Sequence, residues 1–225
     1  MSRSRLLVLT LLAWLLVLAV GCSGGSPAPA AATPSGDLAS TLAAAQQALD
    51  TGNLAAAEQG FRAAVTLDAR SAQAQFGLGN ALVRQNKLAE AEAAYRAAIQ
   101  ADPQMSTAHA NLGVVYYQQG SLTKAAESFN AALRLKADDP QTLYLLGAVR
   151  IQENNLAEAE KLLTRARDLA PDLPEVYYGL GVLHRLRGEK DAAIAAFEKF
   201  LEIGPGQDKS ATDYAQKELA ELKGQ

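Results

Sequence analysis

Two consecutive stretches of 34 residues decide the fold: residues 72–105 read AQAQFGLGNALVRQNKLAEAEAAYRAAIQADPQM, and residues 106–139 read STAHANLGVVYYQQGSLTKAAESFNAALRLKADD. Aligned without a gap, both place a Leu-Gly pair at positions seven and eight, alanine at position twenty and an aromatic ring at position twenty-four. The register continues on either side, and residues 38–207 divide into five blocks without insertion or deletion: 38–71, 72–105, 106–139, 140–173 and 174–207. A period of this length indicates a solenoid of stacked units.

The recurring columns have a mechanical role. Small residues at positions eight and twenty let two helices of one block approach closely, and a large residue at position twenty-four fills the space between neighbouring blocks. Position eight holds Ala45, Gly79, Gly113, Gly147 and Gly181, position twenty holds Ala57, Ala91, Ala125, Ala159 and Ala193, and position twenty-four holds Phe61, Tyr95, Phe129, Leu163 and Phe197.

Position fifteen is glycine or asparagine in every block, and these residues tolerate the left-handed backbone that follows a helix. We therefore predict a first helix over about positions one to fourteen of each block and a second over about positions seventeen to thirty. Residues 209–223 continue as an amphipathic helix, with Tyr214, Leu219 and Leu222 near one face. We expect this helix to cap the last block.

The pattern resembles the tetratricopeptide repeat over all of residues 38–207. The resemblance implies an all-α fold, a right-handed superhelix (α-solenoid) of five helix-turn-helix repeats with a C-terminal capping helix. The composition agrees, because alanine and leucine dominate the apolar fraction and both favour helices. We assign residues 37–225 to this repeat domain.

The chain begins with a different kind of segment. Residues 1–21 open with two arginines and continue into an apolar run over residues 6–20, which is typical of a secretory signal and short of the ~20 residues that a membrane span needs. Residues 18–22 (LAVGC) resemble a lipobox, the cleavage and lipidation site of bacterial lipoproteins, although alanine at position 19 replaces the more usual leucine. The resemblance implies a lipid on Cys22. An ordinary signal peptide, or an uncleaved anchor, is the alternative.

Residues 22–36 follow as the lipidated cysteine and a tether rich in Gly, Ser, Pro and Ala, without charge. Such a segment cannot bury enough surface to offset chain entropy, and we expect it to stay flexible. The expected location is extracytoplasmic, with the lipid in a bacterial membrane. Ser23 favours the outer membrane if the host has one, by similarity to lipoproteins sent there.

Several kinds of chemistry are not expected. The net charge is -3 without a Lys/Arg cluster, which argues against a nucleic-acid partner. Cys22 is the single cysteine, and His109 and His184 lie far apart in the sequence and fall in packing columns, so we expect neither a metal nor a cofactor. We find no convergent set of catalytic residues and expect no enzyme activity.

In tetratricopeptide repeat proteins the first helices line a concave groove, and peptide-binding members generally use positions two, five, six, nine, twelve and thirteen. The resemblance implies a protein or peptide ligand there, extended or helical, with Asn80 and Asn111 bonding its main chain. Phe76, Gln141 and Leu145 replace the cations of a carboxylate clamp, which we therefore set aside. The alternative is that these side chains only line the inside of the curve. The candidate groove residues are Phe76, Asn80, Arg84, Asn111, Val114, Tyr117, Tyr144, Ile151, Tyr178 and Arg185.

The sequence thus predicts a membrane-anchored lipoprotein that acts as a protein- or peptide-binding scaffold in cell-envelope, secretion or pilus assembly. The alternative is an envelope protein that binds a small molecule or a carbohydrate with its aromatic groove.

Overall fold

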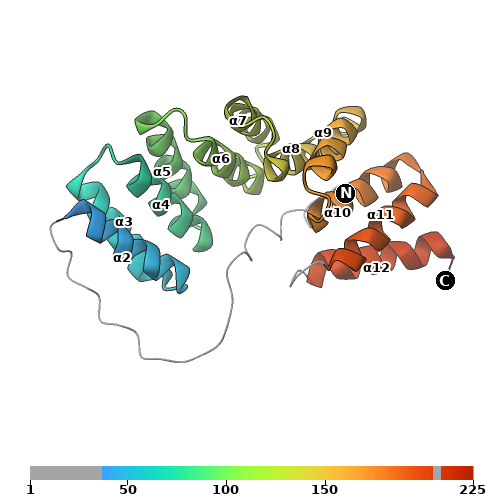
Figure 1. Ribbon diagram of the computed structural model, residues 1–225, viewed down its shortest axis with the longest axis horizontal. Coiled ribbons are helices and arrows are strands. Elements are labelled where there is room, and N and C mark those ends of the chain that lie inside the picture. Colours follow the sequence, from blue (N-terminus) through green and yellow to red (C-terminus); the bar gives the residue numbers. More distant parts are fainter. Residues whose placement is uncertain (1–36, 205–208, 225) are drawn as a thin grey trace. The chain divides into compact units, whose positions relative to one another are not determined.

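The computed structural model describes residues 37–204 and 209–224, and these ranges are helical apart from short turns (Figure 1). The described chain divides after Ser121 into two compact units. This boundary falls inside the third predicted block, between its two helices. The predicted signal segment, Cys22 and the tether lie outside the described residues.

The N-terminal unit contains five helices within its described residues, each packed on the next in chain order. They are α2 (Leu38–Asp50), α3 (Leu54–Leu67), α4 (Ala72–Arg84), α5 (Leu88–Ala101) and α6 (Ser106–Gln118). Figure 1 shows α2 with α3, and α4 with α5, as two helix pairs lying side by side.

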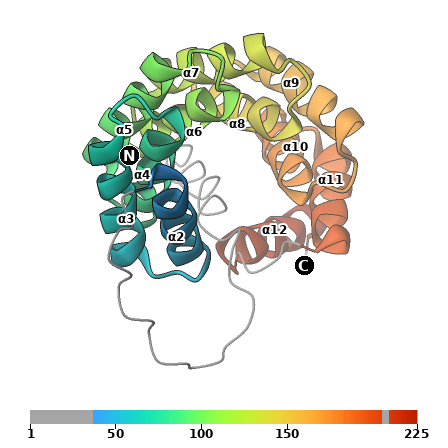
Figure 2. The same cartoon turned by 60° about the vertical axis from the view of Figure 1, so that its left-hand side comes forward.

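The C-terminal unit contains six helices within residues 122–204 and 209–224. They are α7 (Leu122–Leu135), α8 (Pro140–Gln152), α9 (Leu156–Leu169), α10 (Pro174–Arg187), α11 (Lys190–Ile203) and α12 (Lys209–Lys223). Helices α10, α11 and α12 lie against one another (Figure 2).

The helix limits follow the predicted period. In all five blocks the second helix begins at position seventeen and ends at position thirty, and the first ends at position thirteen or fourteen. The residue at position fifteen has a positive φ each time, which confirms the predicted left-handed turn: Gly52 (79°), Asn86 (60°), Gly120 (76°), Asn154 (59°) and Gly188 (76°). Side-chain caps also fix several helix starts, since Asp37, Ser71 and Asp139 each accept a hydrogen bond from the backbone N–H three residues later.

In the second, fourth and fifth repeats, the large residue at position twenty-four lies against the glycine at position eight of its own repeat. A Cβ atom added to Gly79 would lie 2.5 Å from the Tyr95 ring, and one added to Gly181 would lie 2.6 Å from the Phe197 ring. The same column also reaches the following repeat, because a Cβ on Gly77 would lie 2.2 Å from Phe61. Leu163 does both, because a Cβ on Gly147 of its own repeat or on Gly179 of the next would lie 3.0 Å from it.

In the first repeat the two helices also approach closely, but here the glycine lies on the second helix. Ala45 stands at position eight, and Gly60 on the second helix faces it, so that a Cβ on Gly60 would lie 2.7 Å from the Ala45 Cβ. The departure of this block from the repeat pattern is thus compensated on the partner helix.

The capping helix α12 packs on α11 and α10 with the predicted face, although small residues occupy most of its buried positions. Its buried residues are Ala211, Ala215 and Glu218, whereas Leu219 and Leu222 are only half-buried. Ala211, Ala215, Glu218 and Leu222 follow the spacing of one helix face, so the buried side is centred on the direction that the sequence indicates. Tyr214 does point inward, and its ring contacts those of Tyr178 and Phe197.

We expect a methyl group at Gly181 to destabilise the fold more than one at Gly147, the equivalent residue of the fourth repeat. At Gly147 the new Cβ would lie 3.0 Å from the flexible end of Leu163, whereas at Gly181 it meets the Phe197 ring at 2.6 Å. Because alanine favours a helix by about 1 kcal/mol, Gly147→Ala should change the free energy of unfolding by less than about 1 kcal/mol. Gly181→Ala should lower it by about 1–3 kcal/mol. Urea unfolding followed by circular dichroism measures both; equal effects would contradict the packing described here.

Candidate functional site

The candidate residues of the N-terminal unit lie on α4 and α6 at helical spacing. Phe76, Asn80 and Arg84 follow one another every four residues on α4, which places them on one face. Asn111, Val114 and Tyr117 follow every three residues on α6. The structure leaves Phe76, Asn80, Arg84 and Asn111 partly exposed, while Val114 and Tyr117 are buried.

Asn80 and Asn111 form a hydrogen-bonded pair with Tyr95. The Tyr95 hydroxyl donates to Asn80 Oδ1 at 2.7 Å, and Asn111 Nδ2 donates to the same oxygen at 2.9 Å. Burial raises the pKa of Tyr95, so its hydroxyl remains a donor and fixes the orientation of the Asn80 amide. Phe76 lies beside the pair, with its ring centroid 5.8 Å from that of Tyr95.

This arrangement leaves a donor and an acceptor available. Both lone pairs of Asn80 Oδ1 are occupied, and among the described residues nothing accepts from Asn80 Nδ2 or donates to Asn111 Oδ1. A peptide unit carries the complementary groups, a carbonyl oxygen and an N–H. The pair is therefore suited to bind one stretch of main chain.

Arg84 has an internal role. Its Nη1 donates to the Leu49 carbonyl at 2.5 Å, near the end of α2, and the same oxygen accepts from the Gly52 N–H at 3.1 Å. The guanidinium thus ties the second repeat to the first. The remaining N–H groups of Arg84 are available to a ligand.

The candidate residues of the C-terminal unit are more enclosed. Tyr144 and Ile151 on α8 are buried, as is Tyr178 on α10, whose ring contacts Phe197, Phe200 and Tyr214. Arg185 donates to Glu218 of the capping helix at 2.7 Å. Whether any of these side chains contacts a ligand stays a prediction.

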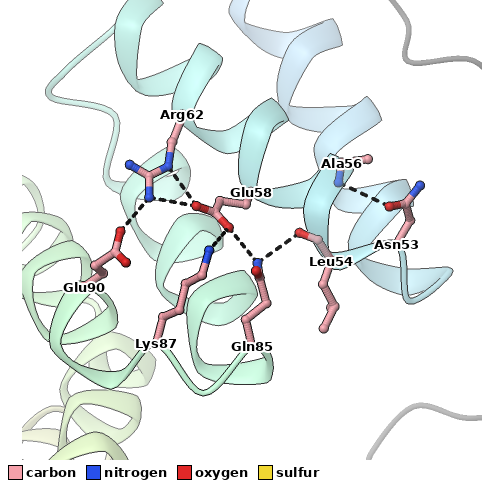
Figure 3. Close-up of polar contacts among 8 residues, drawn as sticks. All are labelled: Asn53, Leu54, Ala56, Glu58, Arg62, Gln85, Lys87 and Glu90. Carbon is pink, nitrogen blue, oxygen red and sulfur yellow. Dashed lines mark hydrogen bonds and ion pairs between the residues drawn. The ribbon is translucent and has the colours of Figure 1, made fainter.

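A second polar cluster, which the sequence did not single out, joins the first two repeats near α3, α4 and α5 (Figure 3). Glu58 accepts from Lys87 at 2.7 Å, from Gln85 at 2.8 Å and from Arg62 at 2.8 Å. Gln85 also donates to the Leu54 carbonyl at 3.2 Å. The hydrogen bond from Lys87, then that from Gln85, lowers the pKa of Glu58 to about 2. The cluster therefore links the first repeat to the second.

The described residues offer little for catalysis or metal binding. His109 lies 3.2 Å from the Pro103 carbonyl, and His184 pairs with Glu189 at 2.6 Å. Within residues 37–204 and 209–224, no group of three or more His, Cys, Asp or Glu side chains gathers in a way that could hold a metal ion. Over the same ranges, every helix is too short or too polar to cross a bilayer.

Comparisons with known proteins agree with this architecture. A model of the tetratricopeptide repeat family matches residues 42–106, 79–140 and 144–208, more than half of the chain. The chain therefore belongs to the tetratricopeptide repeat family, a class of protein-binding scaffolds. No curated protein matches the sequence.

Solved structures show the same fold at low sequence identity. PilF of Pseudomonas aeruginosa is 20% identical over 82% of this chain and 88% of its own, with a TM-score of 0.70. YrrB, a tetratricopeptide repeat protein with an unusual peptide-binding site, is 22% identical over 81% and 93%, with a TM-score of 0.64. MamA of Desulfovibrio magneticus RS-1 is 18% identical over 79% and 100%, with a TM-score of 0.68. The predicted fold class, an all-α tetratricopeptide repeat superhelix, is confirmed.

The Glu58 cluster predicts an acid-dependent contribution to stability. Because the pKa of Glu58 falls from 4.5 to about 2 on folding, its stabilisation is present above pH 4.5 and is lost as the pH falls toward 2. At pH 7, Glu58→Gln should lower the free energy of unfolding by about 1 kcal/mol. The deficit should shrink between pH 5 and pH 3 in denaturant titrations. Glu90→Gln, which removes a more exposed partner of Arg62, is the control and should have a smaller effect; a Glu58→Gln deficit independent of pH would exclude this assignment.

Proposed function

We propose that this chain is a protein- or peptide-binding scaffold held at a bacterial membrane by a lipid on Cys22, and that it serves in cell-envelope, secretion or pilus assembly. The observation that carries the binding proposal is the Asn80–Asn111 pair, whose orientation Tyr95 fixes. Its unused donor and acceptor match the groups of a peptide main chain.

The setting of the pair favours a peptide over a sugar or another small ring. Phe76 offers a partly exposed apolar surface next to the amides, as an anchor for a ligand side chain. Tyr144 and Tyr178, which would stack on a ring, are each 1% exposed. Main-chain recognition beside an apolar contact is the more consistent use of this surface.

The charge distribution also bears on the ligand. The first helices of the N-terminal unit, α2, α4 and α6, contain only Asp50 and Arg84 as charged residues, both at a helix end. The second helices α3 and α5 contain five charged residues: Glu58, Arg62, Glu90, Glu92 and Arg96. A ligand on the first helices of this unit therefore meets an almost uncharged surface, and its binding should depend little on salt.

The membrane and pathway parts of the proposal rest on other support. The lipobox-like residues 18–22 and the uncharged segment after them argue for a lipid anchor. The likeness to PilF concerns the fold, and it makes pilus assembly one of the pathways worth testing. The absence of a catalytic constellation from the described residues supports a binding role.

Removing the Asn111 amide should weaken peptide binding. We suggest selecting peptides on the full chain from a random phage library and measuring their affinity by isothermal titration. Asn111→Leu should raise Kd about tenfold, because it removes a hydrogen bond and leaves a peptide group without its partner. Asn130→Leu on α7, a second helix, is the matched control and should leave Kd unchanged.

The ligand itself gives an independent readout of main-chain recognition. Methylating the peptide nitrogens one at a time should reveal one position at which Kd rises strongly with the wild-type chain and little with Asn111→Leu. Peptides that bind equally well to both chains would exclude the amide pair as the binding site.

The anchor is tested separately. Cys22→Ser should move the protein from the membrane fraction to the soluble fraction of a bacterial expression host, because the acyl chains are the proposed attachment. Mass spectrometry of the wild-type protein should find residues 1–21 removed and Cys22 acylated. An unmodified Cys22 with the leader still attached would refute the anchor and leave the binding proposal intact.

A further inference from the structure

The charged side chains on the first helices of the C-terminal unit form ion pairs with other residues of the chain, with one exception. Each arginine of α8 and α10 binds carboxylates at short distance: Arg150 pairs with Glu153 (2.6 Å) and Glu158 (2.9 Å), Arg185 with Glu218 (2.7 Å) and Arg187 with Glu160 (2.8 Å). The exception is Glu175 on α10, for which the described residues provide no cation.

Glu175 is only 7% exposed, and its Oε2 atom is buried without a hydrogen-bond partner. It lies in the first turn of α10, directly after Pro174, where the helix N-terminus favours a negative charge. Its own backbone N–H interacts with the carboxyl group, but burial outweighs this contact and raises the pKa of Glu175. A buried carboxylate oxygen without a partner is costly, and such atoms are rare in folded proteins.

The position of Glu175 in the repeat indicates which surface it belongs to. It occupies position two of its block, one of the positions that peptide-binding tetratricopeptide repeats use, and the other four blocks hold uncharged residues there: Ala39, Gln73, Thr107 and Gln141. An uncharged side chain at this position is therefore compatible with the repeat fold. The carboxyl group of Glu175 is not needed to build the helix pair.

We infer that Glu175 receives a basic group of a peptide bound on the first helices of the C-terminal unit, a lysine or arginine side chain or the peptide amino terminus, at the N-terminal end of α10. The inference rests on the proposed function, since it names the chemistry of a ligand on the first helices. A cation satisfies both needs of the site, because it donates to the free oxygen and neutralises the buried charge. The slender stems of lysine and arginine can carry a charged head to a carboxyl group below the surface.

The test compares three full-length chains in the same random peptide selection: wild type, Glu175→Gln and the control Glu202→Gln. Glu202 is an exposed carboxylate near the end of α11, so its change to an amide is chemically matched. Peptides from the wild type and the control should be enriched in Lys or Arg at one fixed position, and those from Glu175→Gln should not. A selected basic peptide should bind Glu175→Gln about tenfold more weakly.

A double-mutant cycle then isolates the contact. Replacing the basic residue of the peptide by norleucine should weaken binding to the wild type and have little further effect on Glu175→Gln. Glu175→Gln should also unfold at the wild-type temperature or above, because it removes a buried carboxyl group without a partner. A lower Tm would identify Glu175 as an internal acceptor and overturn the inference.

The outcomes separate this inference from the proposed function. Selected peptides without a basic preference, or the same Kd for wild type and Glu175→Gln, would overturn the role of Glu175 alone and leave the proposed function standing. If no variant selects any peptide, both proposals fail.

Discussion

The structure depends on the contact between a large side chain at position twenty-four and a residue without bulk at position eight. Helices pack at about 8–10 Å between axes, and the smaller distances require that one helix present almost no side chain at the crossing. Gly79 under Tyr95 and Gly181 under Phe197 meet this requirement directly. Leu163 lies against Gly147 of its own repeat and against Gly179 of the next, so one side chain packs within a helix pair and also joins neighbouring pairs.

Polar contacts then join the end of the first helix of one repeat to the second helix of the repeat before it. A donor at position fourteen of one repeat binds the carboxylate at position twenty-one of the repeat before it, and at two joins it also binds the carbonyl at position seventeen. The pairs are Gln85 with Glu58 (2.8 Å), Gln119 with Glu92 (3.4 Å) and Arg187 with Glu160 (2.8 Å). The apolar columns bring the repeats together, and these contacts limit how far one repeat can slide on the next.

The sequence predicted the helices closely because the signals that end them are local. Glycine or asparagine at position fifteen marks each turn by its own backbone preference, and Asn86 and Asn154 adopt the left-handed conformation as readily as the glycines do. The face of α12 was also predicted, because three large side chains mark it. The sequence did not indicate that the small residues Ala211 and Ala215 form its buried centre.

The state of the candidate binding residues could not be predicted in the same way. Arg84 bonds a carbonyl 35 residues earlier, and Asn111 bonds Asn80 31 residues earlier, so both partners lie in another repeat. A residue type and its position in the period do not say whether a neighbouring repeat already uses its donors. Glu175 illustrates the reverse case, because only the structure shows that no described residue pairs with it.

The polar contact between positions fourteen and twenty-one of neighbouring repeats is missing at one place in the C-terminal unit. Between α7 and α8, position twenty-one is Ala126 and position fourteen is Glu153, which turns instead to Arg150 of its own helix. Helix α7 therefore packs on α8 through apolar side chains without this polar contact. Amide hydrogen exchange occurs through the local opening that costs the least free energy. The amides of α7 should therefore exchange faster than those of α9 and α10, because α7 is the helix that opens most easily.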